Sequence, residues 1–112
     1  MIERHTIRVL IVDDHTIVRE GLSLLLDTFS DLEMVGEARN GAQAVDYCSK
    51  YRPDVVLMDL VMPGFDPDGV SAIQIIRQQH PEINILALTS FDQEELVHAA
   101  LEAGATGYLM KN

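Results

Sequence analysis

The sequence predicts an α/β fold built on a doubly wound parallel sheet of five strands. Short apolar runs that fit buried strands alternate with longer segments whose apolar residues recur at helical spacing. Such alternation is typical of a parallel sheet with helices on both faces and right-handed crossovers. The chain has 112 residues and 47% of them are hydrophobic, so one domain can bury a sizeable core.

The strand at 54–59 is the best defined of the five, and it ends in Asp59. Four apolar residues in succession, three of them branched, follow Pro53 and Asp54, as expected for a strand buried on both faces. A carboxylate at the end of such a strand is partly desolvated yet still reachable by solvent, which suits a reactive group. In chain order, the expected strands are 7–12, 33–38, 54–59, 83–88 and 106–110.

Four helices are expected between these strands. His15 and Thr16 open the first, and its apolar residues at helical spacing are Ile17, Val18, Leu22, Leu25, Leu26 and Phe29. Asn40-Gly41 turns the chain into the second helix, whose inward-facing residues are Ala44, Val45 and Cys48.

The third and fourth helices have clear signals at their ends. The third follows the loop 62–69, is broken at Pro81-Glu82, and carries Ile73, Ile76 and Arg77. Asp92 is expected to cap the fourth helix, with Glu95 as its capping-box partner. Gly104 is expected to end it, after a small-residue face formed by Ala99, Ala100 and Ala103.

Charge and cysteine content narrow the class of protein. With 18 acidic and 8 basic residues the net charge is −10, so the chain is a poor candidate for binding nucleic acid or an anionic membrane by itself. The single cysteine, Cys48, excludes an internal disulfide and favours a reducing compartment; we interpret it as a small buried residue. No run is long enough to span a bilayer, and we expect a cytoplasmic protein.

Polar residues follow four of the five expected strands. Asp13 and Asp14 follow the first, Asp59 ends the third, Thr89 and Ser90 follow the fourth, and Lys111 follows the fifth. In a parallel sheet these ends lie along one edge, where ligands bind at the point of strand-order reversal. The topology therefore predicts that these side chains lie close together.

This set of side chains is suited to phosphoryl transfer. Three neighbouring carboxylates repel one another, so one takes up a proton or a cation settles among them. Oxygen ligands favour Mg²⁺ over zinc, with Mn²⁺ as a substitute, and His15 is interpreted as a helix-start residue. A carboxylate nucleophile, a metal, the Lys111 cation and the Thr89 hydroxyl together indicate formation of an aspartyl phosphate.

At these residues the chain resembles the receiver domain of two-component response regulators. The matching features are Val12-Asp13-Asp14, Asp59 followed by Met62-Pro63, Thr89, and the ending 107–111. The stretch 13–22 and that Gly-Tyr-Leu-Met-Lys ending are similar to the NarL/FixJ (LuxR-type) branch. The resemblance covers essentially the whole chain and implies a flavodoxin-like (CheY-like) sheet of order 2-1-3-4-5.

The resemblance also implies a role for each matching residue. Asp59 would accept a phosphoryl group from a kinase phosphohistidine, and Lys111 would contact that group. The metal would be bound by Asp14 directly, by Asp13 through water, by Asp59, and by the backbone carbonyl of Val61. On phosphorylation Thr89 would move toward the phosphoryl group and Tyr108 would follow it inward, although an aromatic residue on a strand is more often simply packed.

At the level of the whole protein, the resemblance implies a signalling domain rather than a turnover enzyme. Its partner would be a sensor histidine kinase, and phosphorylation would control homodimer formation. A helix-turn-helix output domain is expected beyond residue 112, and DNA would be bound only through that domain. No membrane partner is expected.

Three features depart from the family pattern. The loop 62–69 is two residues longer than the usual Met-Pro-x-x-Asp-Gly, and Asn112 stands where many receivers have proline. The family's fifth helix is missing after the fifth strand. Because part of one sheet face would then lie bare, we expect a pairing of chains or a swapped element near the fourth helix and fifth strand.

Three alternative functions fit the sequence less well. An aspartyl-phosphate phosphohydrolase usually carries a second acid two residues after the first, and Val61 stands there. A flavin-binding module would need a hydroxyl-rich and glycine-rich loop after the first strand, where Asp13 and Asp14 instead repel phosphate. A receiver that signals without phosphorylation is disfavoured by the intact acidic set.

Overall fold

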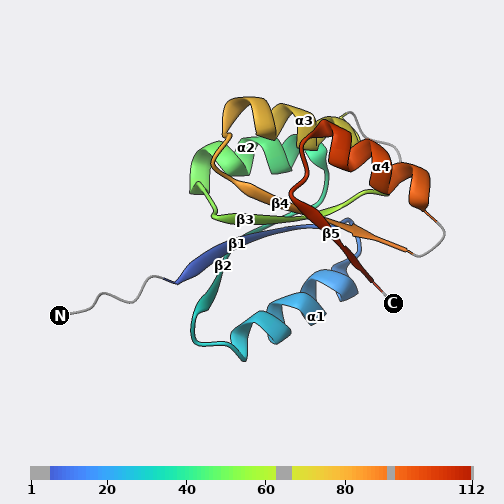
Figure 1. Ribbon diagram of the computed structural model, residues 1–112. Coiled ribbons are helices and arrows are strands. Elements are labelled where there is room, and N and C mark those ends of the chain that lie inside the picture. Colours follow the sequence, from blue (N-terminus) through green and yellow to red (C-terminus); the bar gives the residue numbers. More distant parts are fainter. Residues whose placement is uncertain (1–5, 63–66, 91–92, 112) are drawn as a thin grey trace.

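A computed structural model describes residues 6–62, 67–90 and 93–111 of the chain. Its five strands are parallel and lie in the order β2-β1-β3-β4-β5, which confirms the predicted sheet and strand order (Figure 1). The strands are β1 (Ile7–Val12), β2 (Leu32–Ala38), β3 (Val55–Asp59), β4 (Asn84–Thr89) and β5 (Gly107–Met110).

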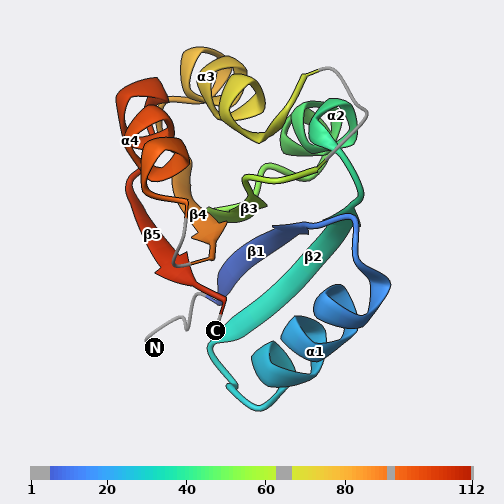
Figure 2. The same ribbon diagram turned by 90° about the vertical axis from the view of Figure 1, so that its right-hand side faces the viewer.

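The helices cover the two faces of the sheet unequally. They are α1 (Thr16–Asp27), α2 (Gly41–Tyr51), α3 (Gly69–Gln79) and α4 (Glu94–Ala103). Among these, α1 alone lies on one face, and the other three lie on the opposite face (Figure 2). Two apolar cores result. The larger contains Leu10, Val56, Met58 and Ile73, and the smaller, under α1, contains Ile11, Leu26 and Leu57.

The two central strands are held in register at the end that carries the acids. Val12 pairs with Met58 and Asp59 pairs with Leu88, so β1, β3 and β4 end side by side. The last four residues of β1 and of β3 are all buried. Burial on both faces explains why these strands are apolar runs with little alternation. Strands β1 and β3 therefore leave the core at the same level, so the residues at their ends lie side by side.

Helix α1 differs from expectation along its length. Arg19 and Leu26 are its buried residues, whereas Ile17 and Leu25 are exposed. Phe29 lies beyond the helix end at Asp27 and is also exposed. Helical spacing was therefore a poor guide to burial here, because a single helix on this side leaves much of its apolar surface uncovered.

Side-chain caps begin two of the other helices, and a glycine ends a third, as predicted for Gly104. Asn40 and Asp68 accept the backbone N–H groups of Gln43 and Ser71, which caps α2 and α3. Helix α4 ends at Gly104, whose φ of 119° favours glycine.

The capping box predicted at the start of α4 is wrong. The structure begins this helix at Glu94 with Gln93 as the N-cap, so Glu95 is not at the capping-box position. Asp92 itself lies outside the described residues, as do Asn112 and part of the loop 62–69.

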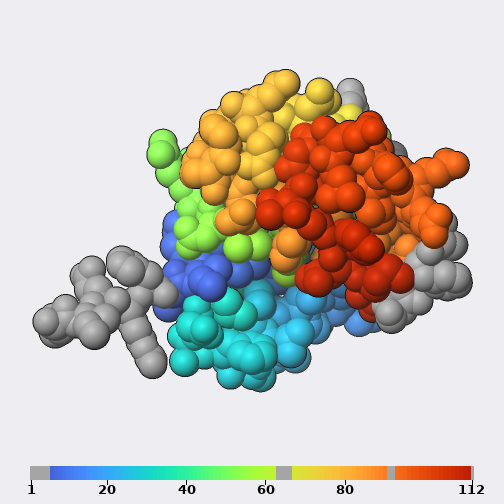
Figure 3. Space-filling view, viewed as in Figure 1, coloured from blue at the N-terminus to red at the C-terminus, as the bar shows by residue number. Residues whose placement is uncertain are grey.

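Apolar side chains are exposed where α1 faces β5. A hollow of about 330 Å³ there is lined by Val18, Leu22, Leu25, Leu88, Leu109, Met110 and Lys111. On the neighbouring face, α4 and β5 form a continuous surface (Figure 3). No helix in the described part of the chain is both long and apolar enough to cross a membrane.

Candidate functional site

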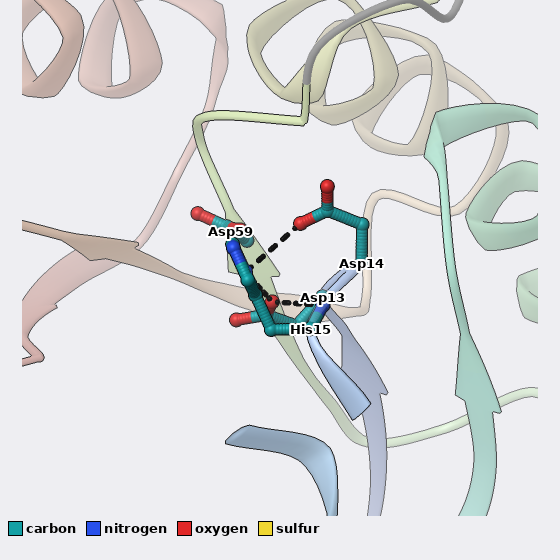
Figure 4. Close-up of side chains that lie close together, drawn as sticks. All are labelled: Asp13, Asp14, His15 and Asp59. Atoms are coloured by element: carbon teal, nitrogen blue, oxygen red, sulfur yellow. Dashed lines mark hydrogen bonds and ion pairs between the residues drawn. The ribbon is translucent and has the colours of Figure 1, made fainter. Parts of the chain in front are cut away.

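The ends of β1 and β3 bring a cluster of acidic side chains together, as the topology predicted. One ligand atom from each of Asp13, Asp14, His15 and Asp59 lies within 4.8 Å of the others (Figure 4). Asp13 and Asp14 form the turn from β1 into α1, and Asp59 is the last residue of β3. The residues lie together because both strands end at the same level.

Asp59 is buried, and one of its two carboxylate oxygens accepts a hydrogen bond from the main chain. Only 2% of the residue is exposed, and its Oδ1 accepts the backbone N–H of Val61 at 3.1 Å. Burial raises the pKa of Asp59, and the nearby charge of Asp13 adds to the rise, while the hydrogen bond from Val61 opposes it. Among the described residues, Asp59 Oδ2 has no hydrogen-bond partner.

Asp13 is fully buried but is better stabilised as an anion. Burial alone would raise its pKa, yet hydrogen bonds from the His15 backbone and from Lys111 outweigh it and lower the pKa. The His15 N–H and His15 Nδ1 both lie 2.9 Å from Asp13 Oδ1. Two buried acids therefore differ in their affinity for a proton because different groups surround them.

Lys111 supplies a cation to both of these acids. Its Nζ lies 3.0 Å from Asp13 Oδ2 and 3.2 Å from Asp59 Oδ1. Its backbone N–H donates to the carbonyl of Thr89 at 2.8 Å, which continues the β4–β5 pairing by one residue. Burial disfavours the charged lysine, but the hydrogen bond to Asp13 and the charge of Asp59 raise its pKa overall.

Thr89 and Tyr108 lie at the side of the cluster toward α4. Thr89 is buried, and its hydroxyl lies 3.0 Å from Gln93 Oε1 and 3.1 Å from the Ser90 carbonyl. Tyr108 is half exposed rather than packed inside. It borders a hollow of about 470 Å³ between α4 and β5, which Glu94 and His98 also line. The hydroxyl of Thr89 is therefore engaged by the start of α4.

Three residues that were not predicted as site residues also shape the site. His15 was interpreted as a helix-start residue, and it is the N-cap of α1, but its Nδ1 also lies 2.9 Å from Asp13 and 3.0 Å from Asp14. Its hydrogen bond to Asp13 raises its pKa. Arg19 contacts the Asp13 backbone, and Gln93 contacts Thr89. For His15, adjacency to two acids was the available signal.

The donor set fits a hard divalent cation. Three carboxylates and an imidazole converge, and the site carries more negative charge than Lys111 neutralises. Asp14 Oδ1 and Asp59 Oδ2 are buried without a hydrogen bond among the described residues, although Asp14 Oδ1 lies 3.0 Å from His15 Nδ1. Buried oxygens without hydrogen bonds are costly unless a cation satisfies them. The cluster could therefore bind a metal ion through oxygen ligands.

Comparison with known proteins gives a consistent result. Residues 9–112 match the family model described as response regulator receiver domain. Response regulator protein VraR of Staphylococcus aureus is 46% identical over 106 residues, which cover 95% of this chain and 50% of that protein. The chain thus spans about half the length of the curated relatives it matches.

Solved structures with the same fold include members of two named regulator groups. A LuxR-family two-component response regulator from Aurantimonas sp. SI85-9A1 is 38% identical with a TM-score of 0.87, over 96% of this chain and 75% of that one. The receiver domain of the putative response regulator NarL from Mycobacterium tuberculosis is 34% identical with a TM-score of 0.87, over 96% and 86%.

Proposed function

Because the chain belongs to the response regulator receiver domain family, a family of signalling domains, we propose that it is a phosphoacceptor and that Asp59 is the residue phosphorylated. One observation carries this assignment. Asp59 is buried at a strand end, with one carboxylate oxygen bound by the main chain and the other without a hydrogen-bond partner among the described residues. That second oxygen is the nucleophile.

The proposed reaction is a transfer between two nucleophiles. Asp59 Oδ2 forms a bond to phosphorus as the bond from phosphorus to the kinase histidine nitrogen breaks, and the electron pair leaves with the imidazole. Lys111 already lies 3.2 Å from Asp59 Oδ1, so it would be close enough to neutralise a phosphoryl oxygen on Asp59. The product is an acyl phosphate on the Asp59 side chain.

The metal that this chemistry uses is Mg²⁺, or Mn²⁺ in its place. Asp14, Asp59 and the Val61 carbonyl would hold it, with Asp13 acting through water. When bound, such an ion neutralises charge on the phosphoryl oxygens. The acids themselves keep that position polar and anionic in the absence of the ion.

The proposed switch begins at Thr89. In this conformation the Thr89 hydroxyl is engaged by Gln93 and Ser90, so it must leave them to reach a phosphoryl oxygen on Asp59. Tyr108, half exposed beside the hollow between α4 and β5, would move inward after it. This movement would change the surface formed by α4 and β5.

Partners follow from the family and its relatives. A sensor histidine kinase would donate the phosphoryl group, and phosphorylation would control homodimer formation in the cytoplasm. Relatives at 46% identity are about twice as long, and one structural neighbour is a LuxR-family regulator, so a DNA-binding output domain would complete the protein. The receiver itself would not bind DNA or turn over substrates as an enzyme.

Intact-mass spectrometry after incubation with acetyl phosphate and Mg²⁺ tests the assignment. The wild-type chain should gain one phosphoryl group, and Asp59→Asn should gain none. Asp54→Asn is the matched control, because Asp54 immediately precedes the opposite end of β3 and accepts the Arg8 N–H at 2.9 Å. A wild-type chain that stays unmodified, or an Asp59→Asn chain that is labelled, would refute the proposal.

A further inference from the structure

Arg19 is a buried charged residue that the proposed chemistry does not use. It lies in the second turn of α1 and is only 7% exposed. A buried guanidinium is costly unless its donors are satisfied. Its Nη1 donates to the backbone carbonyl of Asp13 at 2.7 Å, its Nη2 reaches Thr16 Oγ1 at 3.4 Å, and its Nε lies 3.4 Å from Glu37 Oε1 on β2.

These contacts hold the main chain of Asp13 on both sides. The Asp13 N–H donates to the carbonyl of Ala38 on β2 at 3.0 Å, and its carbonyl accepts Arg19. The carbonyl of Asp13 and the N–H of Asp14 belong to one planar peptide unit. Fixing the direction of that carbonyl therefore fixes the orientation of the peptide plane from which Asp14 departs.

The geometry requires an arginine rather than a generic cation. One planar fork contacts β2 through Glu37, the helix start through Thr16, and the strand end through Asp13. A lysine has a single nitrogen on a flexible stem and cannot contact all three at once. Arg19 thus links β2, α1 and the turn that carries two of the three acids.

We propose that Arg19 is a positioning residue for the metal site, which sets the direction of the Asp14 carboxylate by holding the Asp13 carbonyl. The inference depends on the proposed binding of Mg²⁺ by this cluster. Arg19 touches neither the metal ligands' carboxylate oxygens nor the phosphoacceptor in the contacts described, so its effect passes through the backbone.

The chain contains a matched control in Arg77. This arginine on α3 makes three hydrogen bonds with its side chain, where Arg19 makes two and an ion pair: to the carbonyls of Gly104 and Pro81 at 2.9 and 2.7 Å, and to Thr106 Oγ1 at 3.4 Å. None of these partners belongs to the acidic cluster. Arg19→Met and Arg77→Met therefore remove similar hydrogen bonds at two different places.

Isothermal titration of Mg²⁺ into the metal-free variants separates a positioning role from a structural one. Both variants should melt at a lower temperature than the wild type. Arg19→Met should also raise the Kd for Mg²⁺ about tenfold, in the range found for residues that orient metal ligands, whereas Arg77→Met should leave it unchanged. High Mg²⁺ should restore phosphorylation of Arg19→Met by acetyl phosphate.

Each outcome decides the inference. If Arg19→Met binds Mg²⁺ as tightly as Arg77→Met does, the inference is wrong, while the proposed function stands. If the wild type binds no Mg²⁺, the proposed function fails first and the inference with it. Should Arg19→Met not fold, Arg19→Lys decides: a weaker affinity than that of the wild type supports the role of the fork, and an equal affinity overturns it.

Discussion

Neutralising Asp59 should stabilise the metal-free protein, even though this residue is the proposed phosphoacceptor. At neutral pH its carboxylate is buried, 2% exposed, beside two other acids. Asp59→Asn removes the charge and keeps a carbonyl oxygen that can accept the Val61 N–H. We therefore expect the variant to have a larger free energy of unfolding than the wild type when no divalent cation is present.

The size of the effect follows from the distances. With an effective dielectric constant of about 20, each of two carboxylate neighbours within 4.8 Å contributes about 3.5 kcal/mol of repulsion. On the same scale Lys111, at 3.2 Å, contributes about 5 kcal/mol of attraction. A protonated His15 lies within the same 4.8 Å and offsets one carboxylate by a similar amount, so the charge interactions nearly cancel. The gain on removing the charge therefore comes mainly from relief of the desolvation cost of a buried carboxylate, on the order of 2 kcal/mol.

The pH dependence has a definite sign. The pKa of Asp59 is raised in the fold, so the folded state binds more protons than the unfolded state between the ordinary carboxyl value of 3.8 and the folded pKa. The destabilising contribution of Asp59 is therefore absent below the ordinary value, grows as pH rises through the folded pKa, and is complete above it. The stability gap between Asp59→Asn and the wild type should widen over the same range.

Urea unfolding followed by circular dichroism measures this gap. The titrations are run in EDTA at several pH values and repeated with millimolar Mg²⁺, which should stabilise the wild type more than the variant and narrow the gap. Asp54→Asn is the control and should bring no gain, since it removes a carboxylate that accepts the Arg8 N–H. An Asp59→Asn chain that is no more stable than the wild type in EDTA would refute this electrostatic account.

Three further outcomes are expected. A Cβ on Gly69 would lie 2.5 Å from the Asp59 carbonyl oxygen, so Gly69→Ala should cost about 1–3 kcal/mol in thermal unfolding; Gly21→Ala, with no atom within 4 Å, should not destabilise the chain. Lys111→Met should slow labelling by acetyl phosphate about 100-fold or more, and a rate equal to the wild type would contradict the role of the cation. The thiol of Cys48 is buried and its pKa is raised to about 12, so it should react with Ellman's reagent only in denaturant.

Much of the fold was predictable because each strand carries its own signal. The predicted start of β1 and the predicted ends of β1, β2 and β3 agree with the structure, and the order of strands agrees with the one that the resemblance to receiver domains implied. Long apolar runs between helix signals leave few alternative arrangements. Burial along α1 was less predictable, since the pattern cannot say how much of a helix the neighbouring elements cover.

The site was predictable in its acids and its lysine, but not in its supporting contacts. Parallel strands place Asp13, Asp59 and Lys111 at one edge whatever the side-chain conformations are. The contacts of Arg19 with Asp13 and of Gln93 with Thr89 depend on the direction in which long side chains turn across a loop. The spacing of residues in the sequence does not indicate that direction, so these contacts could be found only in the folded structure.

Lys111, the cation of the site, follows the short and exposed edge strand β5. Strand β5 has four residues, three of them exposed, and within the described residues it is an edge strand that pairs with β4 alone. Its last rung joins Thr89 to Met110, and the Lys111 N–H also bonds to Thr89. If the pairing between Thr89 and residues 110–111 opens locally, Lys111 would move away from the acids and Thr89 would lose a main-chain hydrogen bond at the same time. Strands β1 and β3 would stay paired. Amide hydrogen exchange should thus be faster at 110–111 than in β1 or β3. Local opening of this strand end, rather than global unfolding, would then set how long Lys111 stays paired with the acids.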